Sequence, residues 1–225
     1  MAITDVAVID DDKQSAAVTG VLLEEVGLRP RFVSPHYDDP ARLASDIAST
    51  AEAAVCDHRL QPGGFASFDG ATAVAALFRR GLPAVLITQF LMDADTSIRR
   101  WRKFVPVLLT RERADGRLIA EGLERCASEI RGEFTSERRP ARALVRIENV
   151  TDESNQRVAD ALVPQWHVQQ AIRFPVDLLP EALRDAVAPG VRFFAQVNIN
   201  APGDADLYLS DFELAPAADP HDGLA

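Results

Sequence analysis

Short apolar runs alternate with longer amphipathic stretches over the first 130 residues of the chain. Apolar runs of this length predict buried strands, and apolar side chains at helical spacing predict the helices between them. The expected strands are 6–9, 31–34, 53–56, 83–88 and 105–110. The expected helices are 16–26, 41–50, 71–80, 97–103 and 118–131, the first stopped by Gly27.

This order of elements predicts the fold class of the first part of the chain. Five strands that alternate with five helices indicate an α/β protein, a doubly wound (βα)₅ parallel sheet with right-handed crossovers and helices on both faces. The usual strand order of such a flavodoxin-like sheet is 2-1-3-4-5. In that order the first and third strands are neighbours.

The pattern changes after residue 132. A charged linker, 133–142, contains Pro140 and has no periodicity, and then five short strands follow with one short helix at 181–187. These strands are expected at 143–150, 158–163, 167–176, 191–199 and 206–214. We therefore predict the α/β domain at 1–132, a small mainly-β barrel or sandwich at 143–216, and a flexible acidic tail at 217–225.

Charge narrows the classes of partner. The chain has 24 basic and 34 acidic residues, a net charge of −10, of which −7 falls in residues 141–225. A protein that binds nucleic acid needs a basic face for the phosphate backbone, so we expect no nucleic-acid partner.

Because no apolar run is long enough to cross a bilayer and no basic leader precedes one, we expect no membrane partner and a cytoplasmic protein. Cys56 and Cys126 read as reduced core thiols.

Acidic residues follow two of the predicted strands at the point where each strand ends. Asp10 and Asp11 follow the first strand, Asp57 follows the third, and Thr88 ends the fourth. The carboxyl ends of parallel strands lie at one edge of the sheet, which is where ligands bind in this architecture. Three carboxylates at one edge repel each other unless a cation lies among them, and Mg²⁺ prefers such oxygen ligands.

The sequence resembles a response-regulator receiver (CheY-like) domain over residues 4–131. The matching motifs are VAVIDDD at the first strand, AAVCDHRL at the third, Asp69-Gly70, and VLIT at the fourth. The resemblance implies that Asp57 accepts a phosphoryl group from a histidine kinase and that Thr88 binds that group. It also implies an Mg²⁺ site made by Asp10, Asp11, Asp57 and the backbone carbonyl of Arg59.

Several positions depart from the family pattern. The family's Lys at the end of the fifth strand is missing, and Arg111 is the residue placed to stand in for it. Arginine is a planar fork and lysine a compact ammonium, so this exchange changes the chemistry. Gln89 replaces a very small residue, the aromatic expected on the fifth strand is absent, and the loop 61–69 is longer than in the family.

Two charged groups outside the acid cluster have alternative interpretations. Residues 99–103, Arg-Arg-Trp-Arg-Lys, form the one dense basic stretch, which predicts a solvated face or a contact surface for an acidic partner more than a nucleic-acid site. In receivers the corresponding fourth helix and fifth strand form the usual signalling surface, so self-association through them is a further expectation. Asp204, Asp206, Asp211 and Glu213 have the composition of a Ca²⁺ site but no defined ligand loop.

The expected function is that of an atypical bacterial response-regulator-like signalling protein, phosphorylated on Asp57 with Mg²⁺ and acting through protein–protein contact. Its partner would be a histidine kinase or another signalling protein. The alternative is a pseudo-receiver adaptor that is not phosphorylated and acts as a binding module. We expect no enzyme beyond self-catalysed phosphorylation and dephosphorylation of Asp57. A phosphatase-like enzyme is disfavoured because Arg59 stands where a second carboxylate would be needed.

Overall fold

The computed structural model describes residues 3–89, 97–153 and 156–216, and the predicted tail 217–225 lies outside them. The chain forms two compact units. Unit 1 contains Met1–Asp93 and Phe104–Phe134, and unit 2 contains Ala94–Lys103 and Thr135–Ala225. Among the described residues, no helix has the length and apolar character needed to span a membrane.

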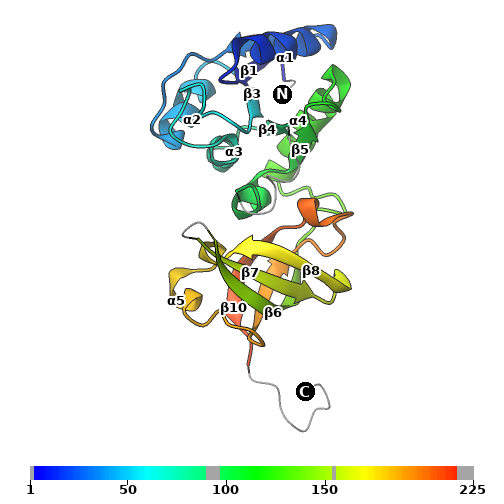
Figure 1. The fold of residues 1–225 in the computed structure, drawn as a ribbon. Helices are drawn as coiled ribbons and strands as arrows, with labels where there is room; N and C mark the ends of the chain where they lie inside the picture. The colour runs from blue at the N-terminus through cyan, green and yellow to red at the C-terminus, as the bar shows by residue number, and fades with distance from the viewer. Residues whose placement is uncertain (1–2, 90–96, 154–155, 217–225) are drawn as a thin grey trace. The chain divides into compact units, whose positions relative to one another are not determined.

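Unit 1 is built on a five-stranded parallel sheet (Figure 1). Its order is β2-β1-β3-β4-β5, so the predicted doubly wound topology is confirmed. The strands are β1 (Asp5–Ile9), β2 (Arg29–Phe32), β3 (Ala53–Asp57), β4 (Ala84–Thr88) and β5 (Val107–Thr110). The central strands are almost fully buried because helices cover both faces of the sheet.

Each α-helix of unit 1 begins at an aspartate N-cap. The helices are α1 (Lys13–Glu25), α2 (Pro40–Ala48), α3 (Gly70–Arg79) and α4 (Gly116–Ile130). Their caps, in the same order, are Asp12, Asp39, Asp69 and Asp115, and each side chain accepts a hydrogen bond from a backbone N–H of the first turn. Helices α1 and α4 contact each other, as do α2 and α3. Several acids of the βα loops are thus explained by helix capping.

Two elements of this unit differ from the sequence prediction. The edge strand β2 begins at Arg29 and ends at Phe32, two residues before the predicted bounds. Its side chains are mostly exposed, so the apolar pattern marks its bounds poorly. The stretch 97–103, predicted as a helix of the first domain, forms the 3₁₀ helix η2 (Arg99–Phe104), and its residues up to Lys103 pack with unit 2.

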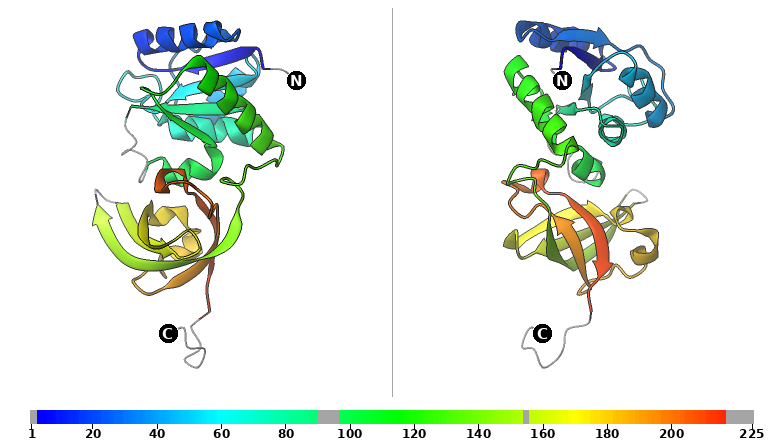
Figure 2. Two further views of the ribbon diagram at one scale, coloured as in Figure 1. Left: turned by 90° about the vertical axis from the view of Figure 1, so that its right-hand side faces the viewer. Right: turned by 180° about the vertical axis from the view of Figure 1, so that it is seen from behind.

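The described part of unit 2 forms a five-stranded antiparallel sheet of order β10-β9-β6-β7-β8, which curves strongly (Figure 2). Phe174, Phe193 and Phe212 lie in its core, as the alternating pattern predicts. The strands are β6 (Ala141–Glu153), β7 (Gln156–Val163), β8 (His167–Pro175), β9 (Arg192–Val197) and β10 (Leu209–Leu214). The short helices are η3 (Val176–Leu178), α5 (Glu181–Arg184) and η4 (Asp204–Asp206).

Candidate functional site

The carboxyl edge of the unit 1 sheet brings the predicted acids together. Because β1 pairs with β3, the residues that follow β1 lie beside Asp57 at the end of β3. Asp10, Asp11 and Asp57 each place one carboxylate oxygen within 4.8 Å of the others. The acids that follow β1 and β3 thus lie together, as the strand order predicts.

Two of these carboxylates are largely removed from water. The side chain of Asp10 is 4% exposed and that of Asp57 is 12% exposed. Burial, followed by the nearby charge of Asp57, raises the pKa of Asp10 above its ordinary value. A positive group near the cluster would therefore be favourable.

Arg111 supplies that charge. It follows β5 directly, and its backbone N–H donates to the carbonyl of Thr88 at 2.8 Å, which aligns it with the end of β4. Its Nη2 donates to Oδ2 of Asp10 at 3.1 Å and also to Oδ1 of Asp57. Although burial opposes the charged form, the carboxylates of Asp57 and Asp10 raise the pKa of Arg111.

Backbone amides occupy other oxygens of the same carboxylates. The N–H of Asp12 donates to Oδ1 of Asp10 at 3.0 Å, and that of Arg59 donates to Oδ2 of Asp57 at 2.7 Å. The N–H of Gly63 donates to Oδ2 of Asp11 at 2.7 Å. Because each hydrogen bond restrains one carboxylate oxygen, these donors fix the orientation of all three carboxyl groups.

The long loop after β3 reaches the cluster because a second loop supports it. Tyr37 and Ala66 form a parallel β-bridge, and the ring of Tyr37 stacks on that of Phe65 at 6.1 Å between centroids. Nδ1 of His36 lies 2.8 Å from the carbonyl oxygen of Gly64. The predicted extra loop is therefore an ordered cover for one side of the site. The sequence predicts the extra length of this loop but not its contact with Asp11.

All of the predicted site residues line one cleft of about 330 Å³. Thr88 is buried at its edge, and Arg59 and Gln89 are exposed beside it. The cleft is lined by Asp10, Asp11, Asp12, Ser15, Asp57, His58, Arg59, Pro62, Thr88, Gln89 and Arg111. The arrangement offers a carboxylate nucleophile, two further carboxylates, a hydroxyl and a guanidinium within one small space.

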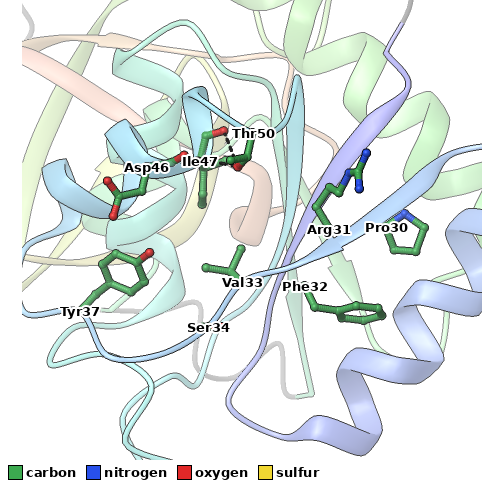
Figure 3. A pocket seen from close by; sticks show the side chains of 9 residues that line it. All are labelled: Pro30, Arg31, Phe32, Val33, Ser34, Tyr37, Asp46, Ile47 and Thr50. Carbon is green, nitrogen blue, oxygen red and sulfur yellow. Dashed lines mark hydrogen bonds between the residues drawn. The ribbon is translucent and has the colours of Figure 1, made fainter.

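A wider cleft of about 730 Å³ lies elsewhere in unit 1, between β2 and α2 (Figure 3). The side chains of Val33 and Ile47 point into it, and Tyr37 lies beside Asp46 on one side. Burial and the Asp46 carboxylate raise the pKa of Tyr37. Asp46 is the one acid among the described residues that line this cleft, so it lacks the grouped carboxylates of the smaller cleft.

The acid cluster has the donor set of a hard divalent cation. Carboxylate and carbonyl oxygens are the ligands that Mg²⁺ takes in proteins, usually one or two carboxylates with water and phosphate oxygens. Asp10, Asp11, Asp57 and the carbonyl of Arg59 would hold such an ion. These residues fit it by composition, while Arg111 already offsets part of the negative charge.

Comparison with known proteins gives matches of fold only. A scan of protein-family models found no match, and a search of curated proteins found none. Solved structures match the first part of the chain. A sensor protein from Polaromonas sp. JS666 is 20% identical with a TM-score of 0.44, and the match covers 56% of this chain and 98% of that chain.

Two further structures are similar over the same part. A response regulator receiver domain protein from Clostridium thermocellum is 12% identical with a TM-score of 0.43, and the match covers 57% of this chain and 98% of that chain. A CheY-like receiver domain from Methylobacillus flagellatus is 18% identical with a TM-score of 0.39 and the same coverage. The predicted resemblance to receiver domains is confirmed as a likeness of fold.

Proposed function

We propose that this chain is a response-regulator-like signalling protein in which Asp57 accepts a phosphoryl group and the signal passes on by protein–protein contact. The observation that supports this most is the position of Asp57 at the end of β3. Its carboxylate lies beside Asp10 and Asp11 and is paired with Arg111. The donor would be a histidine kinase or another phosphorylated signalling protein.

The proposed reaction is a phosphoryl transfer to a carboxylate. An oxygen of Asp57 forms a bond to phosphorus while the bond from phosphorus to the donor breaks, and the leaving group keeps that electron pair. The product is an acyl phosphate on Asp57. Mg²⁺, when bound, would neutralise charge on the phosphoryl oxygens. Arg111 and the hydroxyl of Thr88 line the same cleft and would bind those oxygens.

The second candidate is the pseudo-receiver adaptor, and Arg111 is the observation that favours it. Its guanidinium pairs with both Asp10 and Asp57. A carboxylate held in this way is a weaker nucleophile, because its lone pairs already accept hydrogen bonds from a cation. In that case the acid cluster would be a structural element and the chain would act by binding alone.

Incubation with acetyl phosphate and Mg²⁺, followed by intact mass measurement, separates the two. The signalling proposal expects the mass to rise by one phosphoryl group in the wild type and not in Asp57→Asn. Asp46→Asn, which changes an exposed carboxylate on α2, is the matched control and should still gain the group. No gain in the wild type would leave the adaptor as the function.

Variants of Arg111 test its role separately. If Arg111 serves as the positive group at the end of β5, Arg111→Lys should keep phosphorylation and Arg111→Ala should slow it. The lysine retains a cation, whereas alanine leaves the phosphoryl charge without one. Faster phosphorylation in Arg111→Ala would show instead that the arginine blocks Asp57.

A further inference from the structure

The four cationic side chains of the basic stretch 99–103 contact acceptors elsewhere in unit 2. Arg99 and Arg102 are each only 2% exposed, although they are charged and lie in a short 3₁₀ helix. A buried guanidinium is costly unless hydrogen bonds replace its water. The groups that accept hydrogen bonds from these side chains therefore indicate what the stretch binds.

Backbone carbonyls of one turn accept most of these hydrogen bonds. Nη1 of Arg99 donates to the carbonyls of Leu207, at 3.0 Å, and Asp204. Nε of Arg102 donates to the carbonyl of Ala205 at 2.8 Å, and its Nη2 donates to Oδ1 of Asp206 at 2.8 Å. Burial lowers the pKa of Arg102 to about 10, an effect that Asp206 partly opposes. The turn thus binds the guanidinium of Arg102 through two neighbouring nitrogens, Nε and Nη2.

Interactions within unit 2 hold this turn in place. Asn198 is fully buried, and its Nδ2 donates to the carbonyls of Glu137, at 2.9 Å, and Asp206, at 3.1 Å. Its Oδ1 accepts from the N–H of Tyr208 at 2.7 Å. Asn198 therefore fixes the backbone at Asp206 and Tyr208, next to the carbonyls of Ala205 and Leu207 that the arginines contact, as expected of a preorganised site.

Two acids bind the outer cations of the stretch. Asp177 pairs with Arg100, and Oδ2 of Asp211 lies 3.0 Å from Nζ of Lys103. Asp211 has φ 53 at an irregularity between β10 and β9, and such bulges redirect a side chain. Asp204, Asp206 and Asp211, considered above as Ca²⁺ ligands, thus face arginine and lysine side chains.

Unit 2 also holds the backbone of the stretch. Nη1 and Nη2 of Arg138 donate to the carbonyls of Arg102, at 3.2 Å, and Lys103, at 3.1 Å. Arg138 is itself 4% exposed and lies over the ring of Tyr208, whose hydroxyl donates to the Arg138 carbonyl at 2.9 Å. The contacts therefore involve both main chain and side chains of the stretch.

We propose that unit 2 contains a recognition site for an arginine-rich segment and that residues 99–103 of the same chain occupy it. The site consists of the turn Asp204–Leu207, held by Asn198, with Asp177 and Asp211 at its edges. It follows that the stretch predicted as a contact surface for outside proteins is engaged within the chain. An outside partner would have to displace it or bind elsewhere. This proposal does not depend on phosphorylation of Asp57.

Fluorescence of the full chain tests the proposal without metal or phosphate. The chain has two tryptophans, both in unit 2, so Trp101→Phe leaves Trp166 as the reporter of that unit. In this background Arg102→Met should lower the midpoint of the Trp166 thermal transition by at least about 4 °C. Arg102→Lys should lower it too, because lysine cannot reproduce the fork. Arg113→Met, an exposed arginine of unit 1, is the control and should leave it unchanged. An unchanged transition in Arg102→Met, or full rescue by lysine, would overturn the proposal.

Hydrogen exchange of the unmodified protein covers the case in which a variant fails to fold. The N–H of Trp101, in the stretch, donates to the carbonyl of Ile98, the residue just before it, at 2.8 Å. If the stretch is an integral part of unit 2, this amide should exchange no faster than that of Tyr208, after correction for intrinsic rates. Exchange of Trp101 at least tenfold faster than Tyr208 would show a loosely attached loop and contradict the proposal.

Discussion

The backbone N–H of Gly63 donates a hydrogen bond of 2.7 Å to Oδ2 of Asp11, 52 residues earlier in the chain. A Cβ at Gly63 would lie 2.7 Å from both Cβ and Oδ2 of Asp11. The loop after β3 thus approaches the acid cluster at a distance that only glycine allows. Its contact orients a carboxylate that we propose as a metal ligand.

Gly63→Ala should therefore displace this loop. We expect the free energy of unfolding to fall by about 1–3 kcal/mol, the usual cost of forcing a methyl group into a packed site. Urea unfolding measures the change, and Gly203→Ala is the control, because a Cβ there meets nothing within 4 Å. Equal stability of the two variants would contradict the close approach.

Gly70→Ala tests the position of Asp57. A Cβ at Gly70 would lie 1.9 Å from the carbonyl oxygen of Asp57 and 2.9 Å from Cα of His58, and both are backbone atoms that cannot turn aside. Gly70 also donates its N–H to the carbonyl of His58 at 2.8 Å. We expect a loss of about 3 kcal/mol or more in urea unfolding. A loss smaller than that of Gly63→Ala would argue against this geometry.

The contact between His36 and Gly64, which joins the loop after β2 to the loop after β3, should depend on pH. The carbonyl of Gly64, and then the carboxylate of Asp38, raise the pKa of His36 above 6.5. Because the folded-state pKa is the higher one, the stabilisation is fully present below pH 6.5 and is lost as the pH rises through the folded pKa. Hydrogen exchange of residues 64–67, corrected for intrinsic rates, should be slower at pH 6 than at pH 8.

His36→Gln is the control for that experiment. It should abolish the difference between the two pH values, since glutamine does not titrate there. A titration of the His36 ring by NMR provides a direct check. A measured pKa below 6.5 would show that the imidazolium is not favoured by these neighbours.

Mg²⁺ should stabilise the wild-type protein. An ion held by Asp10, Asp11 and Asp57 binds only the folded state, so a concentration tenfold above its dissociation constant contributes about 1.4 kcal/mol. Thermal unfolding in millimolar Mg²⁺ should therefore show a higher midpoint. The Asp11→Asn/Asp57→Asn variant should be more stable without metal and should not respond to it. Absence of any shift in the wild type would contradict the metal site.

Duplex DNA should not bind to the chain. The four cations of residues 99–103 each contact an acceptor in unit 2, and residues 141–225 carry a net charge of −7. A gel-shift titration with random duplex at low salt is the most sensitive measurement, because low salt favours electrostatic binding. Micromolar binding with a steep salt dependence would restore a role in transcription.

The sequence alone was sufficient for the sheet of unit 1 and for the place of its carboxylates. Buried strands such as β3 and β4 are continuous apolar runs, which local pattern identifies. Once the strand order is known, the residues that follow β1 and β3 must be neighbours, so Asp10, Asp11 and Asp57 were placed together correctly. Arg111 was expected as the positive group of the site from the resemblance to receiver domains, and it pairs with Asp57. The strands and the residues that follow them are identified from periodicity and from where each apolar run ends, and both are properties of short segments.

Tertiary structure decided the partners of groups that carry no periodic signal. Arg99 and Arg102 look like exposed charges in the sequence, and they are buried because carbonyls of Asp204, Ala205 and Leu207, about a hundred residues later, accept their hydrogen bonds. The approach of Gly63 to Asp11 likewise depends on a loop whose path local residues do not specify. A backbone carbonyl is the same acceptor at every position in the sequence, so only the folded chain determines which of them an arginine meets.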